Sequence, residues 1–468
     1  MKSRIFFHFI LLIFLIFLTF FTPPIVNNKI GTIYEDPLSD IKTSGLAGRF
    51  ECYTPQVLAD FENNIHTIWT FSEEYDIYID QKFILEYTKK PVNSTRWVDI
   101  KTLHTPTEDV FRDADFVVDK KENLHLVWRE SLEYRKVFYR CWNASKNKWN
   151  PIEIISDFKE PGSDEPKLLV DDSLTVHVVW SDWSNISGEM YEPNLLYRCR
   201  YNNHESWQPI EILTLETNAS SRKNPTMTFD NDLNIAVAWI ENTELVFKLR
   251  YNNNGSWTNS SIISGGNCEH PSIACDAANN LHFTWMEGSE VNYAKYIRNT
   301  KQISHRKVFE GSHVNNPTMV LDQYENVHIA WEWRLGNDID IWYRYKNAAS
   351  ETWGNTEIVS KESTSHSINP SISVGTNDIL HFVWSDATDY NQVDYDYDIF
   401  YQSKNLTSGE WSTTIVLTSG IKYDTAVQQF ISILVFCILL GSSLVILIIS
   451  PAIIIIRKRK NIINKRNL

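Results

Sequence analysis

The sequence predicts an all-β fold, a seven-bladed β-propeller, and three observations predict it. A short segment ending in tryptophan recurs seven times, the repeats divide into four strand-like runs, and no segment with helical periodicity lies between Glu51 and Thr418. Successive tryptophans are 46 to 59 residues apart: Trp69, Trp128, Trp180, Trp239, Trp285, Trp331 and Trp384. Periods of roughly 20–50 residues, somewhat longer with insertions, are typical of solenoids, propellers and arrays.

The unit around Trp331 shows how each repeat divides into strands. Its four expected strands are short, rich in β-branched or aromatic residues and bounded by Asn, Asp, Gly or Pro: 316–322, 326–331, 341–345 and 353–359. In most units the first strand is expected to begin at a proline, whose missing N–H is tolerated there. Four antiparallel strands per repeat are typical of a propeller blade. A closed ring is favoured over two smaller β-domains, because the spacing is even and an open array would expose hydrophobic faces.

Both ends of the chain are expected to interact with a membrane. Residues 5–21 are almost wholly apolar and follow Lys2 and Arg4, a pattern typical of an export signal that is either cleaved or kept as an anchor. Residues 430–456 carry no charge and are long enough to cross ~30 Å of hydrocarbon. The tail that follows has six basic and no acidic residues, which predicts that it stays in the cytoplasm and that the bulk of the chain lies outside.

The expected organisation has six parts, in a protein of the cell membrane with an extracellular propeller. They are a signal peptide or signal anchor (1–24), a linker (25–44), the seven-bladed propeller (45–420), a juxtamembrane linker (421–429), a transmembrane helix (430–456) and a basic cytoplasmic tail (457–468).

The charge of the exterior part limits its partners. Eight of the 44 basic residues lie in the two ends, so the exterior part has 36 basic and 58 acidic residues, a net charge of −22. Nucleic acid is excluded as a partner, because binding it requires a positive footprint. A surface of this sign favours cations and neutral or basic partners.

The glycosylation sequons agree with export, whereas the cysteines do not define a disulfide framework. Seven Asn-x-Ser/Thr sequons are glycosylation candidates: Asn93, Asn143, Asn185, Asn218, Asn254, Asn259 and Asn405. The exterior part has five cysteines, an odd number that leaves at least one without an intramolecular partner. Cys268 and Cys275 are the expected pair, because they are close in sequence.

The repeated pattern resembles the sialidase-like propeller superfamily, and within it the bacterial-neuraminidase-repeat proteins of prokaryotic surfaces. Over roughly residues 45–420 the units share the form polar-Pro-x-apolar-x-apolar-Asp, turn, Leu-His-x-x-Trp-x-Asp, loop, Asp-Ile-x-Tyr, turn, Trp. The resemblance implies the fold, whereas one fold hosts many functions. Sialidases of this superfamily use three arginines, a tyrosine with a glutamate, and an aspartate, and their turns carry Ser-x-Asp-x-Gly-x-Thr-Trp. The turns here, such as Arg250–Trp257, lack that aspartate. Only Arg49 resembles a triad arginine, and no catalytic residue carries over.

The recurrent histidines are expected to have a structural role. They are His66, His125, His177, His282, His328 and His381, and Ala236 takes the seventh position. Metal ligands must lie ~2 Å from one ion, which equivalent positions around a ring do not allow. Each histidine is therefore expected to bond the backbone of a neighbouring blade. The tryptophan three residues later lies on the other strand face and is expected to pack between blades.

The candidate binding site is a rim formed where the second strands end. Carboxylates follow the recurring tryptophan by two residues in five units, and four of the next loops are long and rich in acidic and aromatic residues. Flat aromatic faces and carboxylates suit sugars, and loops on a rigid scaffold commonly carry function. The candidate ligand-binding residues are Asp182, Trp183, Tyr191, Glu287, Glu332, Trp333, Asp386 and Tyr390.

The last of these loops also suggests a cation site. Asp394, Asp396 and Asp398 alternate, so an extended chain places them on one side, where Ca²⁺ would relieve their repulsion. In the resembled family an aspartate before the Ile-x-Tyr strand is a repeat feature, which favours a structural role for Asp340 and Asp398. The alternative for the whole rim is a solvated acidic surface.

We expect a binding or adhesion protein that recognises a glycan or an extracellular protein on this rim and requires no cofactor, with Ca²⁺ as an optional ligand. One alternative is a cell-surface glycoside hydrolase, since carboxylate pairs ~5–10 Å apart are common on an acidic rim. Another is a non-catalytic structural envelope protein. No phosphate loop, HExxH or GxSxG motif indicates a different enzyme class.

Overall fold

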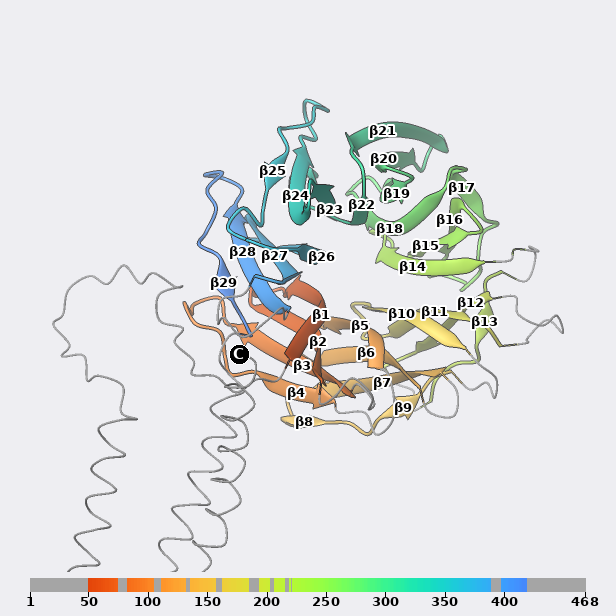
Figure 1. The fold of residues 1–468 in the computed structure, drawn as a ribbon. Coiled ribbons are helices and arrows are strands. Elements are labelled where there is room, and N and C mark those ends of the chain that lie inside the picture. Colours follow the sequence, from red (N-terminus) through yellow and green to blue (C-terminus); the bar gives the residue numbers. More distant parts are fainter. Residues whose placement is uncertain are drawn as a thin grey trace, which may run out of the picture. The chain divides into compact units, whose positions relative to one another are not determined.

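The predicted seven-bladed propeller is confirmed in the described part of the chain (Figure 1). The computed structural model describes residues 49–418 apart from 75–81, 105–110, 132–134, 157–161, 185–192, 203–205, 215–218, 220 and 389–396. These residues form strands and turns, and no helix occurs among them. Six blades are four-stranded sheets, and the second blade has a fifth short strand because its outer edge is split into two.

Each blade is an antiparallel sheet whose strands follow the chain order outward. Blade 1 consists of β1 (Arg49–Ala59), β2 (Ile65–Glu74), β3 (Lys82–Lys90) and β4 (Lys101–His104). Blade 2 consists of β5 (Phe111–Val118), β6 (Leu124–Ser131), β7 (Arg135–Asn143), β8 (Lys148–Trp149) and β9 (Glu153–Ile154). Blade 3 consists of β10 (Ser163–Val170), β11 (Val176–Asp182), β12 (Asn194–Arg200) and β13 (Glu211–Ile212). Blades 4 and 5 consist of β14 (Arg222–Phe229), β15 (Ile235–Glu241), β16 (Glu244–Arg250) and β17 (Ser261–Ser264); and β18 (Cys268–Cys275), β19 (Leu281–Glu287), β20 (Glu290–Ile297) and β21 (Gln302–Glu310). Blades 6 and 7 consist of β22 (Val314–Leu321), β23 (Val327–Leu335), β24 (Asp338–Lys346) and β25 (Glu357–Ile358); and β26 (Ser367–Val374), β27 (Ile379–Asp386), β28 (Asp398–Asn405) and β29 (Ile415–Val416).

An aspartate shapes the hairpin between the first two strands of six blades, and it is buried in all of them except blade 3, where it is half-buried. In blade 1, Asp60 Oδ1 accepts the backbone N–H groups of Glu62 (2.9 Å) and Asn64 (2.8 Å), and Oδ2 accepts the Asn64 amide (2.8 Å). Such local bonds favour a tight turn over a continued strand. The equivalent residues are Asp119, Asp171, Asp230, Asp276 and Asp322, with Gly375 in blade 7.

The hydrophobic core is divided into seven clusters, one between each pair of neighbouring blades. Every recurring tryptophan is at most 1% exposed and packs against the blade before it. Trp180 of blade 3, for example, clusters with Val137 and Ile155 of blade 2. Trp69 of blade 1 clusters with Val383 of blade 7. The predicted packing of the tryptophans between blades is confirmed, and large buried aromatic rings hold the ring together.

The ring closes between blades 7 and 1 without strand exchange among the described residues, because each of these sheets is built from consecutive strands. Instead, β1 lies beside β26. The hydroxyl of Ser371 accepts the N–H of Val57 (3.1 Å), and that of Ser373 accepts the N–H of Ala59 (2.9 Å). Closure therefore rests on packing and on hydrogen bonds between the two blades, which include a backbone bond from the N–H of Cys52 to the carbonyl of Tyr397 (2.8 Å).

The predicted signal and transmembrane segments lie outside the described residues, and within those residues no helix has the length and apolar character needed to span a membrane. The predicted pairing of Cys268 with Cys275 is wrong, since both thiols are free. The two residues are the first and last of β18. A strand rises ~3.3 Å per residue, so the two sulfur atoms are far beyond the ~2 Å of a disulfide.

Candidate binding site at the mouth of the central channel

A β-bulge interrupts the innermost strand of every blade near its start. The pairing register shifts there in all seven blades, for example between Lys223 and Thr226 of β14. In six blades a proline lies inside the shift, with Ala114 in its place in blade 2. The expectation that the strands begin at this proline is wrong, because they begin at least three residues earlier. The missing N–H is tolerated at a bulge, where ladder pairing is interrupted anyway.

The residue before the proline position has a left-handed backbone in all seven blades. Its φ lies between 46° and 55° at Thr54, Asp113, Glu165, Asn224, His270, Asn316 and Asn369. Among non-glycine residues, asparagine, aspartate and to some extent histidine adopt this conformation most readily, and others are strained by about 1 kcal/mol or more. We call these seven residues the channel mouth.

The channel mouth lines a cavity of about 540 Å³. Its wall combines amide and hydroxyl side chains with the carboxylates Asp113, Asp115 and Glu165, the ammonium group of Lys167 and the imidazole of His270. The cavity and the predicted rim share one face of the ring. Because the strands are antiparallel, the start of each first strand lies beside the end of the second, as in the pairing of Ser163 with Asp182.

Two glutamates join neighbouring blades at the channel mouth. Glu165 accepts the backbone N–H (2.5 Å) and the side-chain amide (2.8 Å) of Asn224. Glu332 accepts the side-chain amide of Asn316 (2.7 Å) and the backbone N–H of Asn369 (2.6 Å). Burial raises the pKa of both carboxyl groups, in spite of these bonds. The glutamates therefore fix the bulges that they contact.

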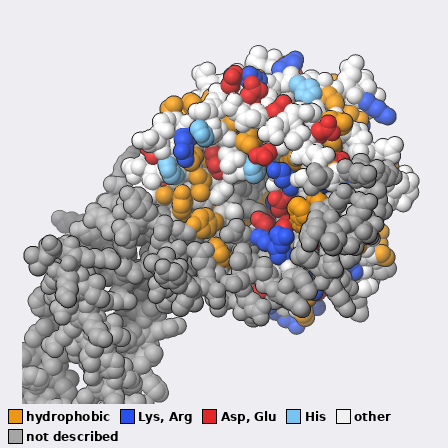
Figure 2. Space-filling view, turned by 45° about the vertical axis from the view of Figure 1, so that its right-hand side comes forward, with side chains coloured by type: hydrophobic (Ala, Val, Ile, Leu, Met, Phe, Trp, Pro, Cys, Tyr) orange, Lys and Arg blue, Asp and Glu red, His pale blue; other side chains and the backbone are white. Residues whose placement is uncertain are grey.

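Opposite charges lie close together beside Glu165. Arg129 Nε lies 3.1 Å from Asp113 Oδ2 and 3.2 Å from Asp164 Oδ1, and Arg135 Nη1 lies 2.5 Å from Asp164 Oδ2. Burial raises the pKa of Asp164 even with both arginines beside it. On the face that Figure 2 displays, acidic and basic side chains are likewise interspersed with neutral and hydrophobic ones, and no field of a single sign forms.

Two predicted ligand-binding carboxylates, Asp182 and Asp386, have no exposed surface. Asp182 accepts hydrogen bonds from Ser163 Oγ (2.7 Å), Trp180 Nε1 (3.0 Å) and the backbone N–H of Ser184 (2.9 Å). Asp386 makes the equivalent bonds in blade 7. In blades 2, 3, 5 and 7 a carboxylate two residues after the tryptophan thus accepts a hydrogen bond from the indole N–H, whereas Glu241 of blade 4 pairs with Arg222 instead.

We expect Asp182→Ala to lower the free energy of unfolding by about 2–4 kcal/mol, because three donors lose their acceptor and an unsatisfied buried group costs ~1–3 kcal/mol. Asp182→Asn keeps one acceptor oxygen and is expected to cost less. Chemical denaturation of the propeller measures both variants. An alanine variant as stable as the wild type would show that Asp182 adds nothing to the fold.

The other predicted rim residues differ in their surroundings. Glu287 accepts hydrogen bonds from Trp285 Nε1 (3.0 Å) and Ser264 Oγ (3.0 Å). Trp183 and Trp333 are partly exposed, and the Trp333 ring centroid lies 4.6 Å from that of Phe309. Tyr191, Tyr390, Asp394 and Asp396 lie outside the described residues.

The structure describes one of the three aspartates suggested for Ca²⁺. Asp398 is buried, accepts a hydrogen bond from Thr418 Oγ1 (2.5 Å), and has a pKa raised by burial. Asp340 accepts the equivalent bond from Ser360 Oγ (2.8 Å). Within the described residues no group of three or more His, Cys, Asp or Glu side chains is placed to hold a metal ion. The Ca²⁺ site stays a prediction.

The sequons in the described residues gather at one end of the blades. Asn93, Asn254, Asn259 and Asn405 are exposed and Asn143 is half-buried, and each either ends a third strand or lies between a third and a fourth strand. The turn between strands three and four lies at the same end of the blade as the turn between strands one and two. This end is opposite to the channel mouth, which lies near the start of strand one. Asn185 and Asn218 lie outside the described residues.

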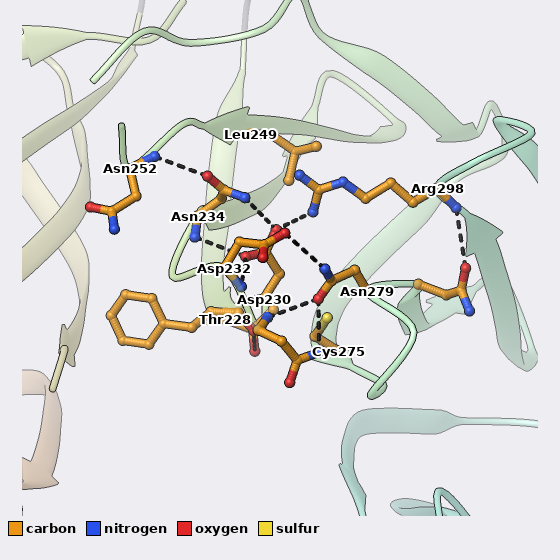
Figure 3. A network of polar contacts seen from close by, with 12 residues as sticks. Thr228, Asp230, Asp232, Asn234, Leu249, Asn252, Cys275, Asn279 and Arg298 are labelled. Carbon is orange, nitrogen blue, oxygen red and sulfur yellow. Dashed lines mark hydrogen bonds and ion pairs between the residues drawn. The ribbon is translucent and has the colours of Figure 1, made fainter. Parts of the chain in front are cut away.

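The histidines bond within their own blades, and the predicted bonds to neighbouring backbones are wrong. His66 Nε2 lies 2.9 Å from Asp60 Oδ2, and Nδ1 lies 2.9 Å from the Tyr87 hydroxyl. In blade 4, where Ala236 replaces histidine, Arg298 of blade 5 pairs with Asp230 (Figure 3). These contacts tie the first hairpin to the third strand or to the next blade.

Sequence reasoning missed the channel mouth, although a signal for it was present. A polar residue recurs before the first-strand proline, as in Glu165-Pro166 and Asn224-Pro225. Proline inside a strand marks a bulge. Seven equivalent bulges on innermost strands converge at the centre of a ring, whereas the predicted rim residues follow the second strands.

Comparisons with known proteins support the fold. No protein-family model and no curated protein matches the chain. The BP39L lectin from Burkholderia pseudomallei is similar with a TM-score of 0.55 and 10% identity, over 80% of this chain and 99% of the lectin. The intramolecular trans-sialidase from Ruminococcus gnavus has a TM-score of 0.43 and 8% identity, over 77% of this chain and 96% of the enzyme. Identities this low show the fold alone. Solved structures that resemble this chain thus include a lectin and a trans-sialidase.

Proposed function

We propose that the protein is a membrane-anchored receptor that binds a glycan at the cell exterior, through the channel mouth and the loops around it. The observation that carries the proposal is the cavity of about 540 Å³ lined by amide, hydroxyl and carboxylate groups. Its volume is in the range of ~300–1,000 Å³ that is usual for ligand sites. Sugar hydroxyl groups both donate and accept hydrogen bonds, and this wall offers partners of both kinds.

The rigidity of the site supports binding. The lining residues lie on innermost strands, and Glu165 and Glu332 hold three of the bulges in place. A site formed before the ligand arrives loses less conformational entropy on binding. The similar BP39L protein is a lectin, so this fold is compatible with sugar binding. A protein ligand on the same face is the alternative within the binding class.

A glycoside hydrolase is the second candidate, and one observation favours it. Burial raises the pKa of Asp115, Asp164 and Glu165, all at or beside the cavity. A general acid must keep its proton near neutral pH, which a raised pKa allows.

Applying the secreted propeller, residues 45–425, to a glycan array with Ca²⁺ and then with a chelator tests the proposal. We expect glycan retention without turnover, and loss with chelator would indicate a bound cation. Consumption of the arrayed glycan would establish the hydrolase instead. Absence of binding in both conditions would contradict the glycan proposal and favour a protein ligand.

A paired substitution locates the site. His270→Gly removes a side chain that lines the cavity, and glycine adopts the positive φ at this position without strain. We expect binding about tenfold weaker, equivalent to ~1.4 kcal/mol. Lys121→Ala, in the exposed first hairpin turn of blade 2 at the opposite face, is the matched control and should bind like the wild type. Equal affinity of the two variants would place the ligand elsewhere.

A further inference from the structure

Both ends of the propeller leave it at the face of the channel mouth. β1 begins at Arg49, which pairs with Glu74 at the end of β2. β29 ends at Val416, which pairs with Phe400 near the start of β28. The ends of second strands and the starts of third strands belong to this face, so both connections to the rest of the chain start there.

The two connections also start close together, at the seam between blades 7 and 1. The backbone N–H of Cys52, near the start of β1, donates to the carbonyl of Tyr397 (2.8 Å). The next residue, Asp398, accepts the hydroxyl of Thr418 (2.5 Å), just beyond β29. The two ends are therefore held against the same short segment of blade 7.

Little chain separates this seam from the predicted transmembrane helix. From Thr418 to Phe430 the chain advances 12 residues, which span at most ~42 Å when fully extended. The strands of a blade are about eight residues long, or ~26 Å. The chain therefore leaves the propeller for the predicted transmembrane helix from the face of the channel mouth, and the opposite face lies roughly one strand length from that exit point.

We propose that the channel mouth faces the membrane that anchors the protein, and that its ligand is the neutral sugar headgroup of a glycolipid in that same membrane. The inference rests on the proposed function and adds the source of the glycan. A glycan on another cell or on a soluble polymer would have to enter the gap between the ring and the bilayer, whose height the tether limits.

Charge narrows the class of headgroup. The exterior part has a net charge of −22, which repels anionic lipids and acidic glycans. The cavity wall offers three carboxylates, the ammonium group of Lys167, which is paired with Asp115, and many neutral polar groups, which together suit uncharged hydroxyl-rich sugars.

The opposite face agrees with this orientation. Asn93, Asn254 and Asn405 are exposed there, at the end of a third strand or in the turn that follows it. Oligosaccharides on these sequons would point away from the membrane and leave the channel mouth open.

Energy transfer to the bilayer tests the orientation. The full chain is placed in phosphatidylcholine vesicles that contain an acceptor-labelled lipid, with a donor on Lys223→Cys or on Lys121→Cys. Lys223 lies beside the channel mouth and its side chain is 40% exposed, whereas Lys121 lies in an exposed turn of the opposite face. We expect more efficient transfer from position 223, because it should be closer by ~25 Å. Wild-type chain labelled in parallel accounts for the native cysteines. Equal or reversed transfer would overturn the proposal.

A binding assay tests the source of the ligand. The glycans of the array are attached to lipids in the vesicle that holds the protein, or to beads added outside. The anchored chain is expected to bind the lipid-linked form and to exclude the beads. A long Gly-Ser insertion between residues 424 and 425 should restore bead binding, because a flexible linker frees the face.

The outcomes separate the two proposals. Bead binding by the anchored wild type, as tight as that of the secreted propeller, overturns the inference and leaves the proposed function standing. The inference is also overturned if the secreted propeller binds the glycan but the anchored chain binds neither the lipid-linked glycan nor the beads. If the secreted propeller binds no glycan, the proposed function and the glycolipid assignment both fail, while energy transfer still decides the orientation.

Discussion

Replacing Trp180 by alanine is expected to lower the free energy of unfolding by about 3–5 kcal/mol, the usual cost of truncating a fully buried aromatic residue. Trp180 has no exposed surface and fills the interface between blades 2 and 3. Its loss also removes the indole donor of the buried Asp182. Domains are typically stable by only ~5–15 kcal/mol, so this is a large fraction of the total. Chemical denaturation followed by tyrosine fluorescence or circular dichroism measures it.

Two phenylalanine variants separate packing from hydrogen bonding. Trp180→Phe and Trp239→Phe remove the same atoms from equivalent interfaces. The indole N–H of Trp239 has no hydrogen-bond partner among the described residues, whereas that of Trp180 donates to Asp182. We expect Trp180→Phe to be more destabilising by about 1 kcal/mol. Equal losses of stability in the two phenylalanine variants would show that the hydrogen bond to Asp182 contributes nothing. For Trp180→Ala, a loss of less than ~1 kcal/mol in the free energy of unfolding would refute the role of this tryptophan in holding the two blades together.

The second large effect is a loss of stability in mild acid. Burial, with a smaller effect of Lys90, lowers the pKa of His381 from 6.5 to about 3. Between these values the unfolded chain binds a proton that the folded chain does not, so stability is complete above about pH 6.5 and falls as the pH decreases. At 1.36 kcal/mol per pKa unit, this residue alone removes about 2 kcal/mol between pH 6.5 and pH 5.

Other buried groups extend this acid sensitivity. The pKa values of His66, His177 and His282 are also lowered, chiefly by burial, and their contributions have the same sign. Asp60 and Asp119 affect stability in a lower pH range. Hydrogen bonds, led by those to His66 and His125, outweigh burial and hold both carboxyl pKa values at about 2, so their stabilisation is lost only as the pH falls from about 4 towards 2.

A single substitution in blade 7 checks the origin of the effect. His381 Nε2 lacks a hydrogen-bond partner within the described structure, because Gly375 occupies the position of Asp60. A Cβ at Gly375 would meet only the ends of two asparagine side chains, Asn63 and Asn377, below 3.0 Å. We expect Gly375→Asp to raise the pKa of His381 and to reduce the loss of stability between pH 6.5 and pH 5. Denaturation at several pH values measures the slopes, and an unchanged slope would contradict this account.

The blade number and strand order were predictable because they depend on local patterns that repeat. Trp180 and Asp182 could also have been paired from the sequence, since residues two apart share one face of a strand. The hydrogen-bond partner of His66 was harder to predict from the sequence. It lies six residues earlier, across a hairpin turn whose geometry Asp60 itself determines.

The channel mouth was harder to predict than either pair. A left-handed backbone at a glutamate such as Glu165 follows from a register shift between two strands, and no residue preference announces it. Locating the cavity also requires knowledge of how the ring closes, because closure brings together seven bulges that are distant in the sequence. The loop residues Tyr191, Tyr390, Asp394 and Asp396 stay predictions, because they lie outside the described residues.

The unexchanged seam between blades 7 and 1 has a consequence for biosynthesis. Six interfaces can form as soon as the next blade has left the ribosome, but the seam joins residues 314 positions apart, such as Val57 and Ser371. Long-range contacts of this kind form slowly. Until the last repeat is translated, the apolar side of blade 1, with Trp69 and Phe71, has no cover. Chains that terminate early would therefore expose this surface, aggregate or attract proteases, and only complete chains would persist.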